Sequence, residues 1–223
     1  MQNASLNSAH LQGANLKSTL LNGADLPFSD LQGANLMGAR LQNAFLWQAK
    51  LQGASFEFAQ LQGAYLKSAQ LQGAYLSDAQ LQGVDLSDAE LQGALLMKTQ
   101  LNGVVLDNKQ LAFSWIEQLG WQQDYDFSRL KTESWAQSEA VQHRLKQAQQ
   151  RVKDFKLPQL SPPMDKETFA TIWLGLLCKD ADATKEMLKP LNYIKGHPIT
   201  KTQAQQYLNS HEQCAPYRNI LTD

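Results

Sequence analysis

The sequence predicts a β-solenoid followed by an all-α region, and three observations support this fold class. Leucine occupies every fifth position from Leu6 to Leu106, with Phe56 as the exception. The position two residues before each of these holds a small residue, nearly always alanine. After Leu111 this rhythm stops and helical patterns begin. The two halves of the chain are therefore expected to fold differently.

The five-residue period excludes an α-helix and a flat strand for the first half. On a helix, a step of five residues turns each leucine by roughly 140°, so the leucines would share no common face. In a continuous strand, side chains alternate with period two, and a step of five would send alternate leucines to opposite faces. The chain must instead coil, with a short strand followed by two turning residues in each unit.

Glycine occurs where such a coil would turn. It recurs at the second position after the central leucine, where positive φ or close backbone approach is needed and glycine accepts both. Low-complexity disorder would give no reason for such regular spacing of leucine and alanine. The glycines at this position are Gly13, Gly23, Gly33, Gly53, Gly63, Gly73, Gly83, Gly93 and Gly103.

The repeated units resemble a known family. Residues 14–18 (Ala-Asn-Leu-Lys-Ser), 24–28 (Ala-Asp-Leu-Pro-Phe) and 34–38 (Ala-Asn-Leu-Met-Gly) are similar to the A(D/N)LXX consensus of pentapeptide-repeat proteins. The resemblance covers residues 4–110 and implies a right-handed quadrilateral β-helix with four pentapeptides per coil. The 21 units would then form about five coils, stacked over about 25 Å. Residues 20 apart should lie above one another.

Two opposite columns of this expected coil carry side-chain amides. Stacked amides can hydrogen-bond along the axis, so both columns are interpreted as structural ladders. Their members are Gln12, Gln32, Gln52, Gln72 and Gln92 on one side, and Asn22, Gln42, Gln62, Gln82 and Asn102 on the other.

Another column is aromatic and forms the candidate protein-interaction surface. It consists of Phe28, Phe45, Trp47 and Tyr65, which come from units centred on Leu26, Leu46 and Leu66. Exposed Trp and Tyr are enriched at the energetic centres of interfaces. The alternative is that helices of the second half fold back and cover these rings, and the sequence leaves both possibilities open. A fourth column presents the same question through Met37, Phe58, Tyr75, Leu95 and Met97.

The predicted domains are a β-helix over 1–110, capping and amphipathic helices over 111–157, and a small helical domain over 158–223. Leu111, Trp115, Ile116 and Leu119 fall on one helical face, and this segment should cap the rod. A heptad-like stripe over Val141, Leu145, Ala148, Val152 and Phe155 predicts a helix that packs within the chain, with a helix dimer as the alternative.

The last 66 residues predict further short helices. The proline-rich stretch from Leu157 to Pro163 reads as a connection. Asp165 is a candidate N-cap for a helix that ends near Asp180. Thr200 with Gln203 resembles a capping box at the start of another helix.

Composition and motifs argue against several functions. The net charge of −1 predicts no direct binding to nucleic acid, and the longest apolar stretch, Phe169 to Cys178, is about half the roughly 20 residues that span a bilayer. No secretory signal is visible, so Cys178 and Cys214 are expected to be reduced thiols in a cytoplasmic protein. The alternative is a disulfide, which would need a fold that brings their Cα atoms within about 7 Å. His211 and Cys214 lack further metal ligands. We expect no metal, no cofactor and no catalytic residue.

The predicted function is a non-enzymatic interaction or structural scaffold with an unidentified protein partner. The family resemblance supplies an alternative, a DNA mimic that modulates a type II topoisomerase such as gyrase. That role needs a strongly negative rod, whereas the repeat half carries eight acidic and six basic residues. Because the repeat begins at the first residues without a cap, self-association through the N-terminal coil is also possible. The chain could equally be the soluble part of a longer, membrane-associated protein.

Overall fold

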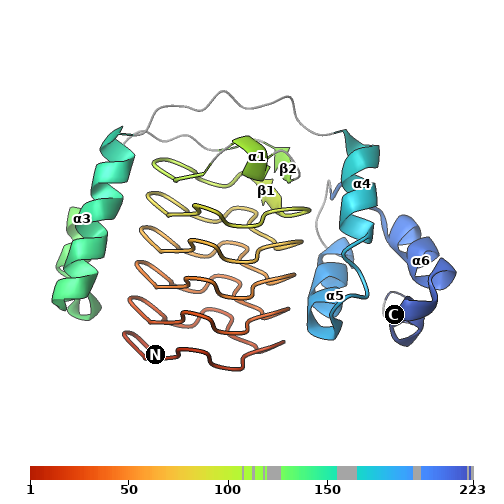
Figure 1. The fold of residues 1–223 in the computed structure, drawn as a ribbon, viewed down its shortest axis with the longest axis horizontal. Helices are drawn as coiled ribbons and strands as arrows, with labels where there is room; N and C mark the ends of the chain where they lie inside the picture. Colours follow the sequence, from red (N-terminus) through yellow and green to blue (C-terminus); the bar gives the residue numbers. More distant parts are fainter. Residues whose placement is uncertain are drawn as a thin grey trace.

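A computed structural model describes residues 1–106, 108–111, 114–117, 119, 127–154, 165–192, 197–219 and 221. The repeat half forms a stack of coils, and helices lie on two opposite sides of it (Figure 1). One long helix flanks one side, and three shorter helices flank the other. The first half is therefore the centre of the molecule, and both of its flanks are covered.

Each coil of the rod contains 20 residues and has four sides. The residue just before each central leucine points outward. Parallel bridges join it to the residue 20 positions later, from Ser5 with Asp25 to Asp85 with Val105. The backbone hydrogen bonds follow the same spacing, for example from Leu6 N to Asp25 O at 2.7 Å. The sequence prediction that residues 20 apart lie above one another is confirmed.

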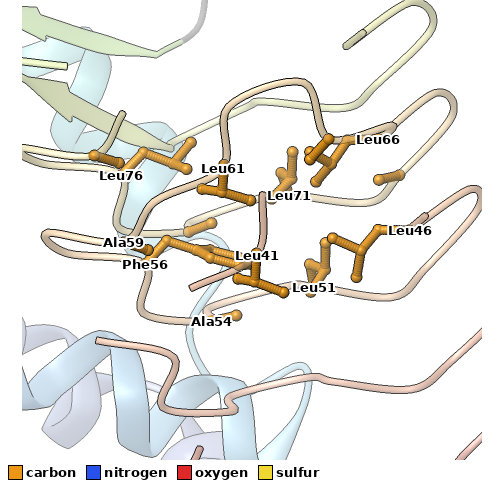
Figure 2. Close-up of a cluster of buried hydrophobic side chains, with 14 of the residues drawn as sticks. Leu41, Leu46, Leu51, Ala54, Phe56, Ala59, Leu61, Leu66, Leu71 and Leu76 are labelled. Atoms are coloured by element: carbon orange, nitrogen blue, oxygen red, sulfur yellow. The ribbon is translucent and has the colours of Figure 1, made fainter. Parts of the chain in front are cut away.

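The leucines and alanines fill the interior of the coils. Leu41, Leu46 and Leu51 are fully buried, and the alanines between them are equally enclosed (Figure 2). Phe56 takes a leucine position and is also fully buried. Burying a leucine side chain contributes roughly 1.5 to 3 kcal/mol, so this stacked core holds the rod together. The inward orientation of every fifth residue is confirmed.

The C-terminal end of the rod is closed by strands as well as by a helix. Strand β1 (Leu95–Met97) pairs in parallel with β2 (Trp115–Glu117), and α1 (Asn108–Leu111) lies between them in the chain. Leu111 is buried against the leucine core, as predicted for a cap. The expected helical face through Trp115 and Ile116 was wrong. These residues continue the coil, because Trp115 lies opposite Leu95 in the next layer.

One flank of the rod is covered by α3 (Glu139–Asp154), which follows α2 (Ser128–Lys131) and the 3-10 helix η1 (Ser134–Ala136). The predicted stripe of α3 is buried at Val141, Leu145, Ala148 and Val152. It forms a cluster with Phe127 and Trp135, so packing within the chain is confirmed. Phe155, the last member of the predicted stripe, lies outside the described residues.

The other flank carries α4 (Lys166–Leu174), α5 (Ala181–Leu188), η2 (Lys189–Asn192), α6 (Lys201–Ser210) and η3 (Glu212–Tyr217). Asp165 caps α4 and Thr200 with Gln203 forms a capping box, both as predicted. However, α4 ends at Leu174 instead of near Asp180. A turn over 175–178 follows, and Asp180 caps α5. The predicted connection from Leu157 to Pro163 lies outside the described residues.

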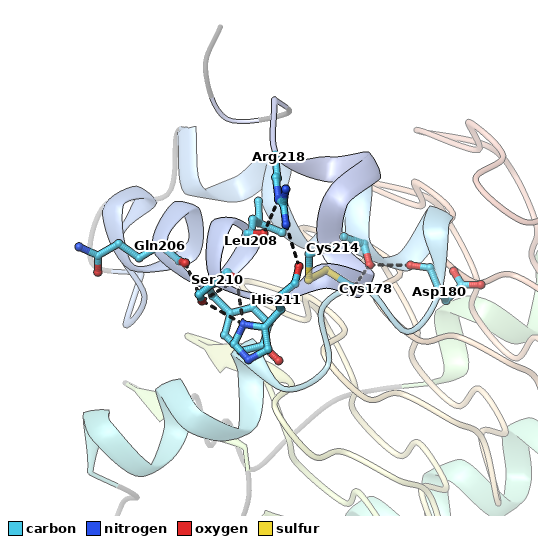
Figure 3. Close-up of a disulfide and its surroundings, with 10 residues drawn as sticks. Cys178, Asp180, Gln206, Leu208, Ser210, His211, Cys214 and Arg218 are labelled. Atoms are coloured by element: carbon cyan, nitrogen blue, oxygen red, sulfur yellow. Dashed lines mark hydrogen bonds between the residues drawn. A yellow bond between two sulfur atoms is a disulfide. The ribbon is translucent and has the colours of Figure 1, made fainter.

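The two cysteines form a disulfide, which overturns the expectation of reduced thiols. Cys178 follows α4 and Cys214 lies in η3, with their Cα atoms 5.2 Å apart (Figure 3). This distance is within the range that permits a disulfide. Sequence spacing could not reveal it, because the fold of the intervening helices brings the two positions together.

Candidate functional site

The predicted aromatic surface divides into two ring pairs on adjoining parts of the rod. Phe45 and Tyr65 precede their leucines and therefore project outward from one flat face, where they stack with centroids 5.0 Å apart. Phe28 and Trp47 follow their leucines at the next corner and meet edge to face at 4.8 Å. The structure therefore brings the four residues together as two pairs, and the two pairs have different surroundings.

Helix α3 partly covers Phe45, one of the two rings on the flat face. The guanidinium of Arg144 lies 5.7 Å from the centroid of Phe45 and 3.6 Å from a carboxylate oxygen of Asp25. Burial lowers the pKa of Arg144, and the charge of Asp25 opposes that shift. Arg144 remains a cation at neutral pH and can attract both the ring and the carboxylate.

A second arginine of α3, Arg151, lies near Tyr65, the other ring of the flat-face pair. Arg151 donates hydrogen bonds to Gly83 O. Burial lowers the pKa of Arg151, and the charge of Asp85 opposes that shift. The covering-helix alternative therefore applies in part to Phe45 and Tyr65.

The corner pair is the more exposed part of the aromatic surface. Phe28 is 46% exposed, and Trp47 is half-buried beside it. Two ion pairs border this region, Lys50 with Asp30 at 3.3 Å and Lys67 with Asp88 at 3.8 Å. Neither sign of charge dominates there. Phe28 and Trp47 therefore offer an apolar contact within a mixed-charge surface.

The residues of the fourth column differ from one another in how far the helices cover them. Tyr75 and Leu95 are fully buried in a cluster with Phe169, Trp173 and Met187 from the helices. The Tyr75 hydroxyl also donates to the carbonyl oxygen of Met187. Phe58, by contrast, is 58% exposed at the corner diagonally opposite that of Phe28. Here the helices explain Tyr75 and Leu95, and they leave Phe58 on the surface.

Glycine columns at two opposite corners of the rod receive the helices. Val141 O of α3 accepts a hydrogen bond from Asn43 Nδ2 at 3.1 Å, and Val152 lies against Gly103 three coils further along. Eleven residues of helix rise about 16 Å, and three coil spacings rise about 14 Å. The stripe of α3 therefore nearly matches the spacing of the coils.

The second column, from Gly13 to Gly93, receives α4 and α5. A Cβ added at Gly53 would lie 2.7 Å from Ala183 O, and one at Gly73 would lie 2.7 Å from the Cε of Met187. A cavity of about 230 Å³ remains beside this column, between Gln32, Gln52 and Gln72 of the rod and the α4–α5 segment. The lining residues from that segment are Leu176, Lys179, Asp180, Ala183 and Met187.

The spacing of glycine along the repeat is a sequence signal for this docking, and the five-residue period alone does not contain it. Between Gly13 and Gly103, glycine recurs every ten residues except at Asn43, so it marks mainly two opposite corners, and Gly38 lies at one of the other two. The other two corners carry side chains such as Ser8, Phe28, Ser18 and Phe58 at the same backbone position, also with positive φ. Turning alone does not require glycine here. Close approach of a helix does, because a Cβ would fill the space.

The amide columns beside these glycines only partly form the predicted axial ladders. Gln2 donates to Asn22, and Asn22 donates to Gln42, each to the residue 20 positions later. Gln42 and Gln52 instead donate sideways to Gln60 and Gln70, at 2.6 and 2.7 Å. The outward residue of the next coil lies close enough to the corner to compete for the amide.

The titratable groups do not assemble a recognisable reaction centre within the described part of the chain. Burial lowers the pKa of His197 to about 4, and its Nδ1 lies 3.0 Å from the Ile199 nitrogen. His211 Nδ1 lies 3.1 Å from Ser210 Oγ but 2.9 Å from Tyr207 O, so a proton on Nδ1 can bind that carbonyl. Across the described ranges, no group of three or more His, Cys, Asp or Glu is placed to hold a metal ion.

No helix in the described residues is both long enough and apolar enough to cross a membrane.

Comparisons with known proteins identify the repeat half. A family model described as pentapeptide repeats matches in eight copies over residues 1–38, 29–67 and 64–103. No curated protein matches the sequence. Among solved structures, the chain is similar to a pentapeptide repeat protein from the thylakoid lumen of Arabidopsis thaliana. The identity is 31%, with 45% of this chain and 73% of that chain covered at a TM-score of 0.26.

Two further solved structures are similar over about half of this chain. A pentapeptide repeat protein from Nostoc PCC 7120 is 32% identical, with 51% of this chain and 84% of that chain covered at a TM-score of 0.24. QnrB1, a plasmid-mediated fluoroquinolone resistance protein, is 15% identical, with 53% and 68% covered at a TM-score of 0.25. The residues matched by the family model end before the helices that flank the rod.

Proposed function

This chain belongs to the pentapeptide-repeat family through residues 1–103, and on that premise we propose that it is a non-enzymatic scaffold for protein–protein contacts. Family membership implies a right-handed quadrilateral β-helix, here a rod of about five coils and about 25 Å. The contact surface is the aromatic group of Phe28, Phe45, Trp47 and Tyr65, with Phe28 and Trp47 as its exposed centre.

The observation that carries the proposal is the exposed edge-to-face pair on a rigid corner. The backbone nitrogen of Phe28 donates a hydrogen bond to the carbonyl oxygen of Trp47 at 2.9 Å, so the backbones that carry the two rings are held together. A partner would therefore lose little conformational entropy in ordering this surface. Large aromatic side chains at such positions are the residues that most often dominate binding energy.

A pair of matched variants tests this assignment. Phe28→Asn combined with Trp47→Ala removes both corner rings, and asparagine tolerates the positive φ of 58° at residue 28. Phe58→Asn removes an exposed ring at the same backbone position on the opposite corner, where φ is 59°. Binding partners captured from the source cells by full-length protein are then quantified by mass spectrometry.

We expect the double variant to lose at least about tenfold in recovery of a specific partner, because hot-spot aromatics contribute about 2 kcal/mol or more. Phe58→Asn should retain that partner. Equal recovery with all three proteins, with unchanged melting temperatures, would exclude the corner pair as the contact. Tyr65→Ala, with both corner rings retained, then asks whether the flat face contributes.

The family alternative, a DNA mimic acting on a type II topoisomerase, receives weaker support. The repeat half has eight acidic and six basic residues, a difference of two, and ion pairs such as Lys50 with Asp30 neutralise part of the acidic surface. A DNA mimic needs a strongly negative surface. A gyrase supercoiling assay separates the two functions, since inhibition at micromolar protein would support the mimic.

Self-association through the N-terminal coil is a further proposal about partners. Leu6 and Leu11 are only partly buried, whereas leucines further along the rod are enclosed. Light scattering of the full chain at several concentrations tests it, and a strictly monomeric mass at every concentration would exclude it.

A further inference from the structure

The disulfide closes a loop that contains the helix docked on the second glycine column. Cys178 and Cys214 are 36 positions apart, and α5, η2 and α6 lie between them. Residues 165–192 and 197–219 are called the C-terminal helical module below. The disulfide therefore acts on the segment whose position decides whether this side of the rod is covered.

Helix α5 packs directly against the rod. Ala183 lies against Gly53, and Met187 lies against Gly73 while its carbonyl oxygen accepts a hydrogen bond from Tyr75. The adjacent amides of Gln52 and Gln72 line the cavity that α5 helps to close. Displacement of α5 would expose both the glycine column and these amides.

The hydrophobic core of the module is small, although the module must stay folded to keep α5 on the rod. Its buried cluster includes Tyr75 and Leu95 of the rod and Cys214 of the disulfide. The other buried members are Phe169, Ala170, Trp173, Leu177, Met187, Leu188, Ile199, Ala204, Leu208 and Leu221. In a unit of this size a single core seldom contributes more than about 3 to 5 kcal/mol, and disulfides commonly add to that stability. Opening this disulfide is therefore expected to loosen α5.

The two sulfur positions differ in accessibility and in backbone conformation. Cys214 is fully buried, whereas Cys178 is partly exposed. The backbone φ of Cys178 is +66°. Among the described residues outside the repeat, Cys178 alone has a positive φ. Non-glycine residues stay in that region when surrounding structure holds them, here the disulfide and the hydrogen bond from Cys178 N to Thr184 Oγ1 at 2.8 Å. Cys178 is therefore the side from which a reductant can enter.

We propose that Cys178–Cys214 is a thiol–disulfide exchange site, entered at Cys178 by a dithiol reductant, that releases α5 from the rod. The reductant thiolate attacks Cys178 Sγ, the bond between the two cysteine sulfurs breaks, and Cys214 leaves as a thiolate that takes up a proton. The second thiol of the reductant, after losing its proton, attacks the mixed disulfide and frees Cys178. The protein gains two electrons and two protons, and the dithiol becomes a cyclic disulfide.

The first test is amide hydrogen exchange on the full chain, with and without dithiothreitol. Mass spectrometry first establishes that the untreated protein has no free thiol and that the treated protein has two. We expect amides of α5 and α6 to exchange on the order of 100-fold faster in the reduced protein. Amides in the coils formed by residues 21–100 should not change. Unchanged exchange of α5 with two free thiols would overturn the proposal, as would two free thiols in the air-oxidised protein.

Cys178→Ser combined with Cys214→Ser is the matched variant. It should exchange at α5 like the reduced wild type and should not respond to dithiothreitol. If α5 were as protected in this variant as in the oxidised protein, the disulfide would have no part in holding it. Protection of residues 21–100 in the same sample reports whether the rod has folded.

The direction of attack is tested on the wild type. Brief treatment with glutathione, a quench with N-ethylmaleimide and peptide mapping identify which cysteine carries the mixed disulfide. We expect glutathione on Cys178 and maleimide on Cys214. The reverse pattern, or equal labelling of the two, would overturn entry at Cys178.

Discussion

The carbonyl oxygen of Gly83 in the rod accepts two hydrogen bonds from the guanidinium of Arg151 in α3, from Nε at 2.8 Å and from Nη2 at 2.6 Å. Ala148 lies against the same glycine, so α3 approaches the rod backbone closely at this level. A planar guanidinium can reach one acceptor with two donors, which a lysine ammonium cannot reproduce in the same geometry.

Arg151→Gln should destabilise the attachment of α3 by about 1.5 to 3 kcal/mol, since hydrogen bonds from charged groups are of this size. Arg151→Lys should recover only part of the loss. Urea unfolding with hydrogen exchange of α3 measures both. Lys153→Gln, an exposed position two residues along the same helix, is the control and should be neutral. Equal effects at residues 151 and 153 would contradict a specific role for the Gly83 contact.

Leu46→Asp should unfold the rod or lower its melting temperature by roughly 10 °C or more, because it buries an unpaired carboxylate among enclosed leucines. Gln48→Asp is the matched control, since Gln48 is exposed and its φ of 54° suits aspartate. Circular dichroism melting curves compare the two variants. A melting temperature of Leu46→Asp within a degree or two of wild type would refute the importance of leucine stacking.

Gly53→Ala and Gly38→Ala separate backbone strain from helix docking. Both glycines have φ near +65°, so each variant incurs about 1 to 2 kcal/mol from the left-handed conformation. At Gly53 the new Cβ would also lie 2.7 Å from Ala183 O, whereas at Gly38 the nearest atom is Ser18 Oγ at 3.5 Å. Gly53→Ala should therefore lose about 1 to 3 kcal/mol more, with faster exchange of α5. Equal losses would show that the glycine column does not control docking.

His197 should make the protein less stable in mild acid. Burial lowers its pKa from 6.5 to about 4, so the unfolded chain binds a proton at a higher pH than the folded chain does. The contribution of neutral His197 to the free energy of unfolding is fully present above about pH 6.5 and is lost as the pH drops toward 4. The total loss is on the order of 3 kcal/mol. Denaturant unfolding between pH 4 and 7.5 measures this slope.

His197→Asn is the control for that slope, because its Oδ1 can replace Nδ1 as the acceptor for Ile199 N. The variant should be less stable at neutral pH through lost packing against Trp173, and its pH dependence should be shallower. An identical slope in both proteins would assign the acid sensitivity to other groups.

Most of the rod could be predicted from the sequence, because its interactions repeat locally. Each leucine, small residue and turning position recurs every five residues, so one geometric solution satisfies all of them, and burial of Leu41, Leu46 and Leu51 agrees with it. The caps at Asp165 and at Thr200 with Gln203 were also predictable, because a cap involves residues only three positions apart.

The candidate surface could be predicted only as a set of outward aromatic residues. Whether Phe45 and Tyr65 lie under α3, and whether Phe28 remains exposed, depends on where a helix about 100 residues later comes to lie. The same holds for Tyr75, which the sequence placed in an equivalent position and which the helices bury completely. Periodicity gives the direction of a side chain but contains no information about a distant segment that covers it.

By itself, the sequence determined the coil, its leucine core, its corners and the presence of helices after residue 110, since each follows from patterns within a few residues. Only the tertiary structure decided that Trp115–Glu117 extends the coil, that Cys178 and Cys214 meet, and which aromatic rings stay on the surface. These outcomes depend on contacts between segments far apart in the chain. Such contacts are set by packing of whole elements, which no local pattern records.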